Sequence, residues 1–173
     1  MSTISYAEVV TSDVQWLDND QQRAWRGLLD LSAALRARLH RELQATSGLS
    51  LADYDVLVHL TDLPDGRLRA FELGEGLQWE KSRVSKQVAR MAKRGLVVKQ
   101  DCPEDRRGAY VALTDKGLRA IEEAAPAHVE LVRRLVFDNL SAAQVRTLSR
   151  IAATVVRKLD EESEGDVVKI AAV

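Results

Sequence analysis

The sequence predicts a mainly α-helical protein that carries one small β-hairpin. Apolar residues recur at helical spacing through most of the 173 residues, as they do along the buried face of an α-helix. Two short runs, GLVVKQ from Gly95 and AYVAL from Ala109, flank the turn-like segment CPEDRRG. Two such runs around a turn are typical of a hairpin. The fold class follows from these two observations.

The first long helix is expected within residues 18–48, after an N-terminal arm over residues 1–17. Asp18 or Asp20 can cap its start, because a carboxylate accepts hydrogen bonds from the unpaired amides of the first turn. The helix should stop before Gly48, since glycine commonly follows the last helical residue. Its apolar positions are Leu28, Leu31, Leu35, Leu39 and Leu43.

Residues 49–113 are expected to form a winged helix, in which a helix–turn–helix precedes the hairpin. The run SLAD places Ser50 at the cap of a second helix and Asp53 near its positive end. That helix ends at the turn LPDG, which has the composition of a tight turn. A short helix near residues 69–76 and a longer one over residues 80–94 precede the hairpin.

Two more helices are expected in the C-terminal part, residues 114–160. Together with the first helix they can pair with a second copy of the chain and act as dimerisation helices. Thr114 caps the first of them, and Pro126 should bend or divide it because proline lacks an amide donor. Ser141 opens a capping box with the glutamine three residues later. The last helix bears the apolar residues Val145, Leu148, Ile151, Ala152, Val155 and Leu159. Residues 161–173 form a tail without a clear pattern, which can be disordered.

Composition and motifs argue against several classes of protein. Cys102 is the only cysteine, so no disulfide can form within the chain and a reducing, cytoplasmic location is expected. No apolar run approaches the roughly 20 residues that span a bilayer, and the first ten residues lack a secretory signal. We therefore expect no membrane partner.

Catalysis is not expected either. The chain has no G-x-S-x-G motif, no phosphate-cradling glycine loop and no C-x-x-C pair. Its histidines, His40, His59 and His128, fall on different predicted helices without the spacing of metal ligands. The sequence thus predicts no enzymatic activity, no cofactor and no metal site.

One segment is strongly cationic in a chain of formal net charge −1. Residues 80–107 hold nine lysines and arginines against four acids, so this segment carries +5 and the remainder carries −6. Such a separation of charge indicates a negatively charged partner at one place on the surface.

Helical phase sorts these cations. At about 100° per residue, Val84, Val88 and Met91 form the buried stripe of the fourth helix. The opposite face holds Ser82, Arg83, Ser85, Lys86, Ala89, Arg90 and Lys93. That face fits a DNA major groove, where arginine can fork to guanine and lysine suits the phosphates. Lys81 and Arg94 lie nearer the edges of the stripe and are weaker candidates.

The hairpin tip adds a second cationic element. Asp105 can hold one of its neighbours Arg106 and Arg107 in place, while the other reaches into a narrow, electronegative minor groove. Each element alone is also explained by a solvated surface or an ordinary loop. Together they share one sign and the order of a winged helix, which favours binding to double-stranded DNA. The alternative, a winged-helix module that docks protein, predicts apolar or acidic residues on the exposed helix face, and the sequence has neither.

The segment from LADYDVLVHL to VALTDKG resembles the core of the MarR family of bacterial transcription regulators. The most specific pieces are SRVSKQVARMAKRGLV, the D-x-R pattern of the wing in DRR, and VALTDKG. The resemblance extends over about residues 20–160. It implies a homodimer whose first and last helices intertwine and whose two lobes read a pseudo-palindromic operator, most simply as a repressor.

The resemblance also assigns residues. It places Ser82, Arg83, Ser85, Lys86 and Arg90 on the recognition helix, and it makes Asp105 and Arg107 the D-x-R of the wing, with Arg106 as an extra cation. One departure concerns the start of that helix. Glu80 stands where the family often has a serine or aspartate cap, and the bulky Trp79 precedes it.

The resemblance further implies an effector, because many members of the family release DNA when a small aromatic or phenolic anion binds between the dimer helices and the lobe. Candidate pocket residues are Trp25, His40, Tyr54 and His59, although core packing and hydrogen bonds to the backbone also explain each of them. Cys102 offers an alternative. Cations near the wing would favour its thiolate and make the chain a redox-responsive regulator.

Overall fold

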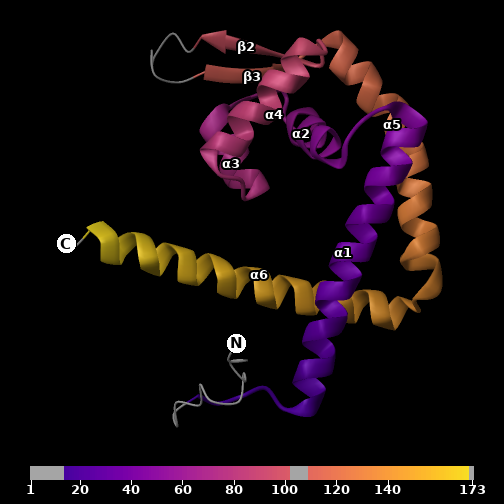
Figure 1. The fold of residues 1–173 in the computed structure, drawn as a ribbon, viewed down its shortest axis with the longest axis vertical. Coiled ribbons are helices and arrows are strands. Elements are labelled where there is room, and N and C mark those ends of the chain that lie inside the picture. Colours follow the sequence, from indigo (N-terminus) through magenta and orange to yellow (C-terminus); the bar gives the residue numbers. More distant parts are fainter. Residues whose placement is uncertain (1–13, 102–108, 172–173) are drawn as a thin grey trace, which may run out of the picture.

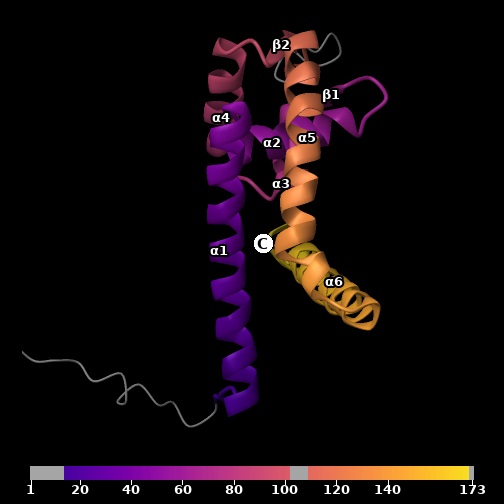
Figure 2. The ribbon, with the colours of Figure 1, turned by 90° about the vertical axis from the view of Figure 1, so that its right-hand side faces the viewer.

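The computed structural model describes residues 14–101 and 109–171. The elements are α1 (Asn19–Ser47), α2 (Leu51–Thr61), β1 (Arg67–Arg69), α3 (Ala70–Leu77), α4 (Lys81–Lys93), β2 (Val97–Asp101), β3 (Ala109–Leu113), α5 (Asp115–Leu135), the 3-10 turn η2 (Phe137–Asn139) and α6 (Ala142–Ala171). One lobe contains α2, α3, α4 and the strands (Figure 1). The helices α1 and α5 lead away from that lobe, and α6 extends from the far end of α5 (Figures 1 and 2). The predicted fold class, a winged helix between flanking helices, is confirmed.

The first helix begins and ends where its caps predict. The Asp18 carboxylate accepts hydrogen bonds from the amides of Asp20 and Gln21, at 2.8 Å each, and the Gln21 side chain accepts from the Asp18 amide. Asp18 rather than Asp20 is therefore the N-cap. The helix stops at Gly48, whose φ of 66° is left-handed. Glycine adopts this conformation without steric cost, so the chain can turn sharply into α2.

The second helix starts at the predicted Ser50 cap and supplies the centre of the core. Ser50 Oγ accepts from the Asp53 amide at 3.0 Å, and the Asp53 carboxylate accepts from the Ser50 amide at 2.8 Å. This reciprocal pair is a capping box. The largest fully buried apolar side chains come from α1 to β3, and they are Leu43, Leu49, Val56, Leu57, Leu60, Leu73, Val88, Met91 and Val111.

The predicted hairpin forms, and a third strand joins it. β2 and β3 are antiparallel, with Val97 opposite Leu113 and Asp101 opposite Ala109. β1 pairs with the other edge of β3, so the sheet order is β1-β3-β2. The sequence did not predict β1 because an arginine on each side of Leu68 gives no run of β-branched residues.

The helix after the hairpin is one element despite its proline. Thr114 caps it as predicted, since its Oγ1 accepts from the Gly117 amide at 3.0 Å. The helix continues through Pro126 to Leu135, and Figure 1 shows its axis changing direction along the way. A bent rather than divided helix is the outcome of the missing amide donor.

Gly117 marks a close backbone approach between α5 and the residue that precedes β2. A Cβ atom at Gly117 would lie 2.0 Å from the carbonyl oxygen of Leu96, the residue before β2. Atoms cannot pack that closely, so only glycine fits this position without movement of the backbone. The last residue of the VALTDKG segment thus has a packing role.

The final helix is longer than the sequence predicts. Ser141 Oγ accepts from the Gln144 amide at 3.3 Å and Gln144 Oε1 accepts from the Ser141 amide at 2.8 Å, as the capping box requires. The helix then continues to Ala171, through most of the tail at residues 161–173 for which the sequence predicts no element. Among the described residues, none of the helices combines the length and apolar character that a membrane crossing needs.

Candidate nucleic-acid interface

The helix α4 exposes the face that helical phase predicts. Val84, Val88 and Met91 are buried, at 3% exposure or less. The six predicted contact residues are all exposed, namely Ser82, Arg83, Ser85, Lys86, Arg90 and Lys93. The helix contains no acid, so no carboxylate of its own neutralises this cationic face.

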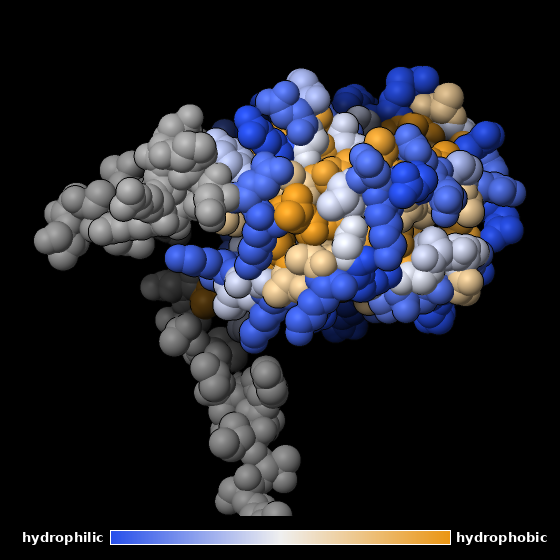
Figure 3. Space-filling model, turned by 90° about the horizontal axis from the view of Figure 1, so that it is seen from above, coloured by the Kyte–Doolittle hydropathy of each residue, from blue (hydrophilic) through white to orange (hydrophobic). Residues whose placement is uncertain are grey.

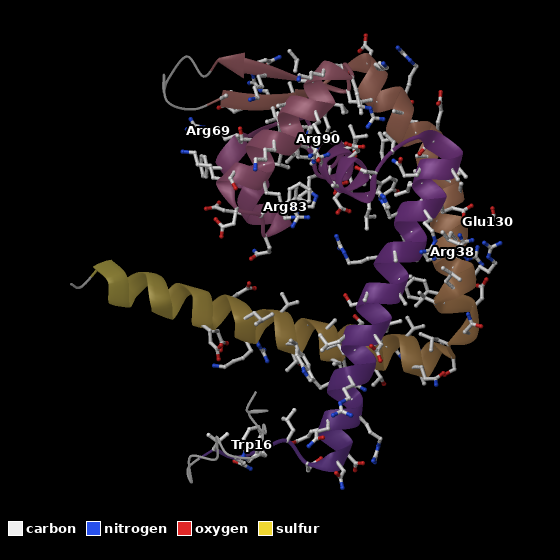
Figure 4. The ribbon with its side chains drawn as sticks, in the orientation of Figure 1. Trp16, Arg38, Arg69, Arg83, Arg90 and Glu130 are labelled. Carbon is white, nitrogen blue, oxygen red and sulfur yellow. The ribbon has the colours of Figure 1, made fainter. Side chains whose placement is uncertain are left out.

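The entrance of α4 gives Trp79 a specific contact. The Arg83 guanidinium carbon lies 4.1 Å from the centroid of the Trp79 ring, which is cation–π geometry. Glu80 is the N-cap residue, but its side chain makes no capping hydrogen bond. The helix therefore starts without the side-chain cap that the family often has. Instead, the aromatic ring of Trp79 contacts Arg83. Figure 4 shows Arg83 and Arg90 in the lobe, far from Trp16 at the other end of the molecule.

A buried carboxylate lies beneath α4. Asp53 is 4% exposed and its carboxylate accepts from Arg94 Nη1 at 2.7 Å. Arg94 also donates to the carbonyl of Gly48 at 2.8 Å. Arg94 thus ties the end of α4 to the junction of α1 and α2, which explains why it is a weaker candidate for DNA contact than the residues on the exposed face.

Gln87 extends this network to the exposed face. It is 2% exposed, and its Nε2 donates to Asp53 Oδ1 at 2.6 Å. Its Oε1 accepts from Arg90 Nη2. Sequence reasoning assigned no role to Gln87. The available signal was a polar residue next to Val88 on the apolar side of the helix.

The sheet carries two further cations that the sequence did not single out. Arg67 and Arg69 lie over the ring of Tyr110, at 5.1 and 5.6 Å from its centroid. Arg69 is opposite Tyr110 in the register of β1 and β3. Seen from the hairpin end of the lobe, hydrophilic side chains border smaller apolar areas (Figure 3).

The predicted hairpin tip lies outside the described residues. Asp105, Arg106, Arg107 and Cys102 all fall between the end of β2 and the start of β3. Their assigned roles, as wing contacts and as a redox element, remain predictions.

Two of the effector candidates make backbone hydrogen bonds. His40 Nδ1 accepts from the Leu51 amide at 3.2 Å, which satisfies the first amide of α2. His59 Nδ1 lies 3.0 Å from the carbonyl oxygen of Asp55, and its Nε2 lies 3.2 Å from that of Gly76. Backbone hydrogen bonds of this kind are the alternative explanation of the two histidines, and their ligand role stays a prediction.

The other two candidates have different surroundings. Trp25 is 52% exposed on α1, whereas Tyr54 is buried at 8% and stacks on His128 with ring centroids 4.2 Å apart. A cleft of about 700 Å³ lies between α3, the first half of α4 and the hairpin, and none of the four candidates lines it. Its charged lining residues are Arg69, Lys81, Lys99, Glu75 and Glu80.

The contact between Tyr54 and His128 forms a polar cluster with Asp55. Burial raises the pKa of Tyr54, and the nearby Asp55 charge adds to this. Burial also raises the pKa of Asp55, against the opposing charge of Arg36. For His128, burial lowers the pKa, with Asp55 opposing. His128 Nδ1 is buried without a hydrogen-bond partner among the described residues, so this cluster has unused hydrogen-bonding capacity that the sequence did not indicate.

Comparison with known proteins identifies the family. The sequence profile of the MarR family matches residues 47–108. The crystal structure of Sco3205, a MarR family transcriptional regulator from Streptomyces coelicolor in complex with DNA, is 38% identical to this chain. The match covers 84% of this chain and 92% of Sco3205, with a TM-score of 0.81. This chain belongs to the MarR family.

Two further relatives support that membership. AbsC, a MarR family regulator from Streptomyces coelicolor, is 34% identical over 85% of this chain and 99% of its own, with a TM-score of 0.80. The HTH-type transcriptional repressor IacR from Pseudomonas putida is 38% identical over 79 residues. That match spans 46% of this MarR-family chain and 47% of IacR, about half of each.

Proposed function

We propose that this MarR-family regulator is a sequence-specific DNA-binding repressor that works in the cytoplasm as a homodimer on a pseudo-palindromic operator. One observation carries the proposal: α4 exposes Arg83, Lys86, Arg90 and Lys93 on one face without an acid in the helix. Such a face suits the phosphates and base edges of a major groove. The DNA complex of Sco3205 and the repressor name of IacR support it.

The homodimer is proposed from apolar surface that the single chain leaves uncovered. Large apolar side chains on α1 and α6 are 43–58% exposed, namely Trp25, Leu28, Leu29, Leu31, Leu148, Ile151, Val155, Val156 and Leu159. Contiguous apolar stripes of this kind mark interaction sites, and burying one such side chain fully contributes about 1.5–3 kcal/mol. A second copy supplies the same stripes, so both helices become covered at once in a two-fold arrangement.

The proposed mechanism places two copies of α4 in successive major grooves, about 10 base pairs apart. Arg83 and Arg90 are the candidates for guanine contacts, and Lys86 and Lys93 for phosphate contacts. The wing residues Arg106 and Arg107 would reach the flanking minor grooves, with Asp105 as their orienting partner.

Relief by a small aromatic or phenolic effector is the regulatory part of the proposal. Tyr54 on α2 and His128 on α5 stack with ring centroids 4.2 Å apart, and the buried Nδ1 of His128 has no hydrogen-bond partner among the described residues. An effector that reached this contact would meet one aromatic surface and one polar partner. An effector lowers DNA affinity only if it binds better to a form of the dimer with a different lobe spacing.

Selection of bound sequences from a random DNA pool tests the function. We expect a palindrome whose half-sites are about one duplex turn apart, and binding that Arg83→Ala weakens in a fluorescence anisotropy titration. Arg23→Ala is the matched control, because it removes the same charge from the exposed start of α1. Recovery of no common sequence would contradict the proposal, and equal loss in both variants would contradict the role of α4.

A further inference from the structure

The exposed face of α4 is connected to a buried polar pair. Gln87 and Asp53 are 2% and 4% exposed, and they are the buried polar or charged side chains in the described core. Polar groups in a low-dielectric interior are costly unless hydrogen bonds hold them in one arrangement. Once fully bonded, such groups have little freedom to reorient.

The chemistry of the pair fixes the direction of its hydrogen bonds. An ionised carboxylate only accepts, so Gln87 must turn its amide nitrogen toward Asp53 Oδ1, at 2.6 Å. The amide oxygen of Gln87 then faces the opposite way, where it accepts from Arg90 Nη2. The orientation of Arg90 therefore depends on a carboxylate in another helix.

The carboxylate itself is held from two other directions. Asp53 Oδ2 accepts from the Ser50 amide at 2.8 Å and from Arg94 Nη1 at 2.7 Å. The whole relay thus runs from the start of α2, through Asp53 and Gln87, to an arginine on the exposed face.

We propose that Asp53 and Gln87 are positioning residues that hold Arg90 in the orientation from which it reads a base, and that they thereby set the sequence discrimination of the interface. The inference rests on the proposed DNA-binding function. Arginine recognises guanine through a planar fork of two hydrogen bonds, so its guanidinium must lie in one plane. The bond to Gln87 uses one of the five donors of Arg90 and leaves the others for DNA.

A double-mutant cycle separates this positioning role from packing. Gln87→Met removes both side-chain hydrogen bonds at similar volume. We expect it to reduce the ratio of affinities for the selected operator and its single-base variants by about tenfold at the base pair that Arg90 reads. In an Arg90→Ala background, the same substitution should change that ratio by less than about twofold, because the positioned group is gone.

Met91→Leu is the matched control. Met91 is buried in the same stripe of α4 and takes no part in the relay, so any effect of this volume-conserving change should be equal in both backgrounds. Circular dichroism and sedimentation of each variant report whether the fold and the dimer are intact.

A charge exchange provides a second, independent test. Gln87→Glu alone places two carboxylates face to face in a buried site, so discrimination should fall. Adding Asp53→Asn should restore it to within about threefold of the original protein, because the new amide can donate to the new carboxylate. That carboxylate still accepts from Arg90.

Three results would overturn the inference. An equal loss of affinity for all sequences, or an equal effect of Gln87→Met in both backgrounds, would make Gln87 a packing residue only. The third is a double exchange that folds but recovers no discrimination. If the unmutated protein selects no sequence from the pool, the proposed function fails and this inference fails with it. If the protein selects a palindrome but the double-mutant cycle is additive, the proposed function stands and only the positioning role of Asp53 and Gln87 is rejected.

Discussion

Gly117→Ala tests the packing of α5 against Leu96, the residue that precedes β2. The new Cβ would lie 2.0 Å from Leu96 O and 2.9 Å from Leu113 Cδ1. Since Cβ contacts under 3.0 Å are essentially never observed, the backbone around Leu96 must move. That movement disturbs the hydrogen bonds that Leu96 O accepts from the Thr114 amide at 3.3 Å and from Thr114 Oγ1 at 3.0 Å.

The expected loss of stability follows from these contacts. Overpacking a filled site costs about 1–3 kcal/mol, and two weakened neutral hydrogen bonds add about 0.5–1.5 kcal/mol each. The free energy of unfolding should therefore fall by about 2–6 kcal/mol, a large share of the roughly 5–15 kcal/mol that stabilises a typical domain. Urea denaturation at one fixed protein concentration measures it, since association contributes to stability.

Gly27→Ala is the matched control. A Cβ at Gly27 meets no atom of the described chain within 4 Å, so the added methyl group creates no close contact there. Alanine should stabilise the helix there by up to about 1 kcal/mol. If the free energy of unfolding of Gly117→Ala lies within about 1 kcal/mol of that of the unmutated protein, the close approach at Leu96 is relieved without cost and the reasoning is wrong.

Three other predictions concern association, DNA and pH. Ile151→Glu with Val155→Glu should convert the proposed dimer to monomers in sedimentation, because both charges enter the apolar stripe of α6. The same glutamates at Arg150 and Arg157, on the opposite face, should leave the proposed dimer intact. DNA affinity should fall steeply with salt, and Lys86→Ala should lower the slope of log affinity against log salt by about 1, whereas a flat series would favour the protein-docking alternative. Burial lowers the pKa of His128 in the folded protein, so His128 binds a proton more readily in the unfolded chain than in the folded one. The stability that neutral His128 contributes is present above its ordinary pKa of about 6.5 and declines as pH falls through the lower folded value. His128→Phe should flatten that decline in thermal unfolding between about pH 7.5 and about pH 5, and an unchanged pH dependence would contradict it.

Local rules sufficed for elements whose signals lie within a few residues. Ser50, Thr114 and Ser141 each cap the helix that the sequence assigns to them, and Asp18 is the one of two candidates, Asp18 and Asp20, that caps the first. A cap is predictable because it depends on residues three positions away. Helical phase likewise predicted which side of α4 is buried, since one apolar stripe decides it.

Long-range contacts were not predictable in the same way. The bond from Gln87 to Asp53 joins residues 34 positions apart, and the bond from Arg94 to Gly48 joins residues 46 positions apart. Neither leaves a periodic signal, since each depends on how two helices cross. The strand β1 was missed for a related reason: only its pairing with β3 makes three residues a strand.

The stacking of Arg83 on Trp79 gives the protein an optical reporter at the entrance of α4. Trp16 and Trp25 are 68% and 52% exposed and belong to the far part of the chain, whereas Trp79 is half-buried under a cation 4.1 Å away. Indole emission depends on the polarity and charge around the ring, so with Trp16 and Trp25 replaced by phenylalanine the remaining signal would come from this one position. If Arg83 moves away from the Trp79 ring to contact a DNA groove, the tryptophan emission should change, and no attached dye is needed to detect binding.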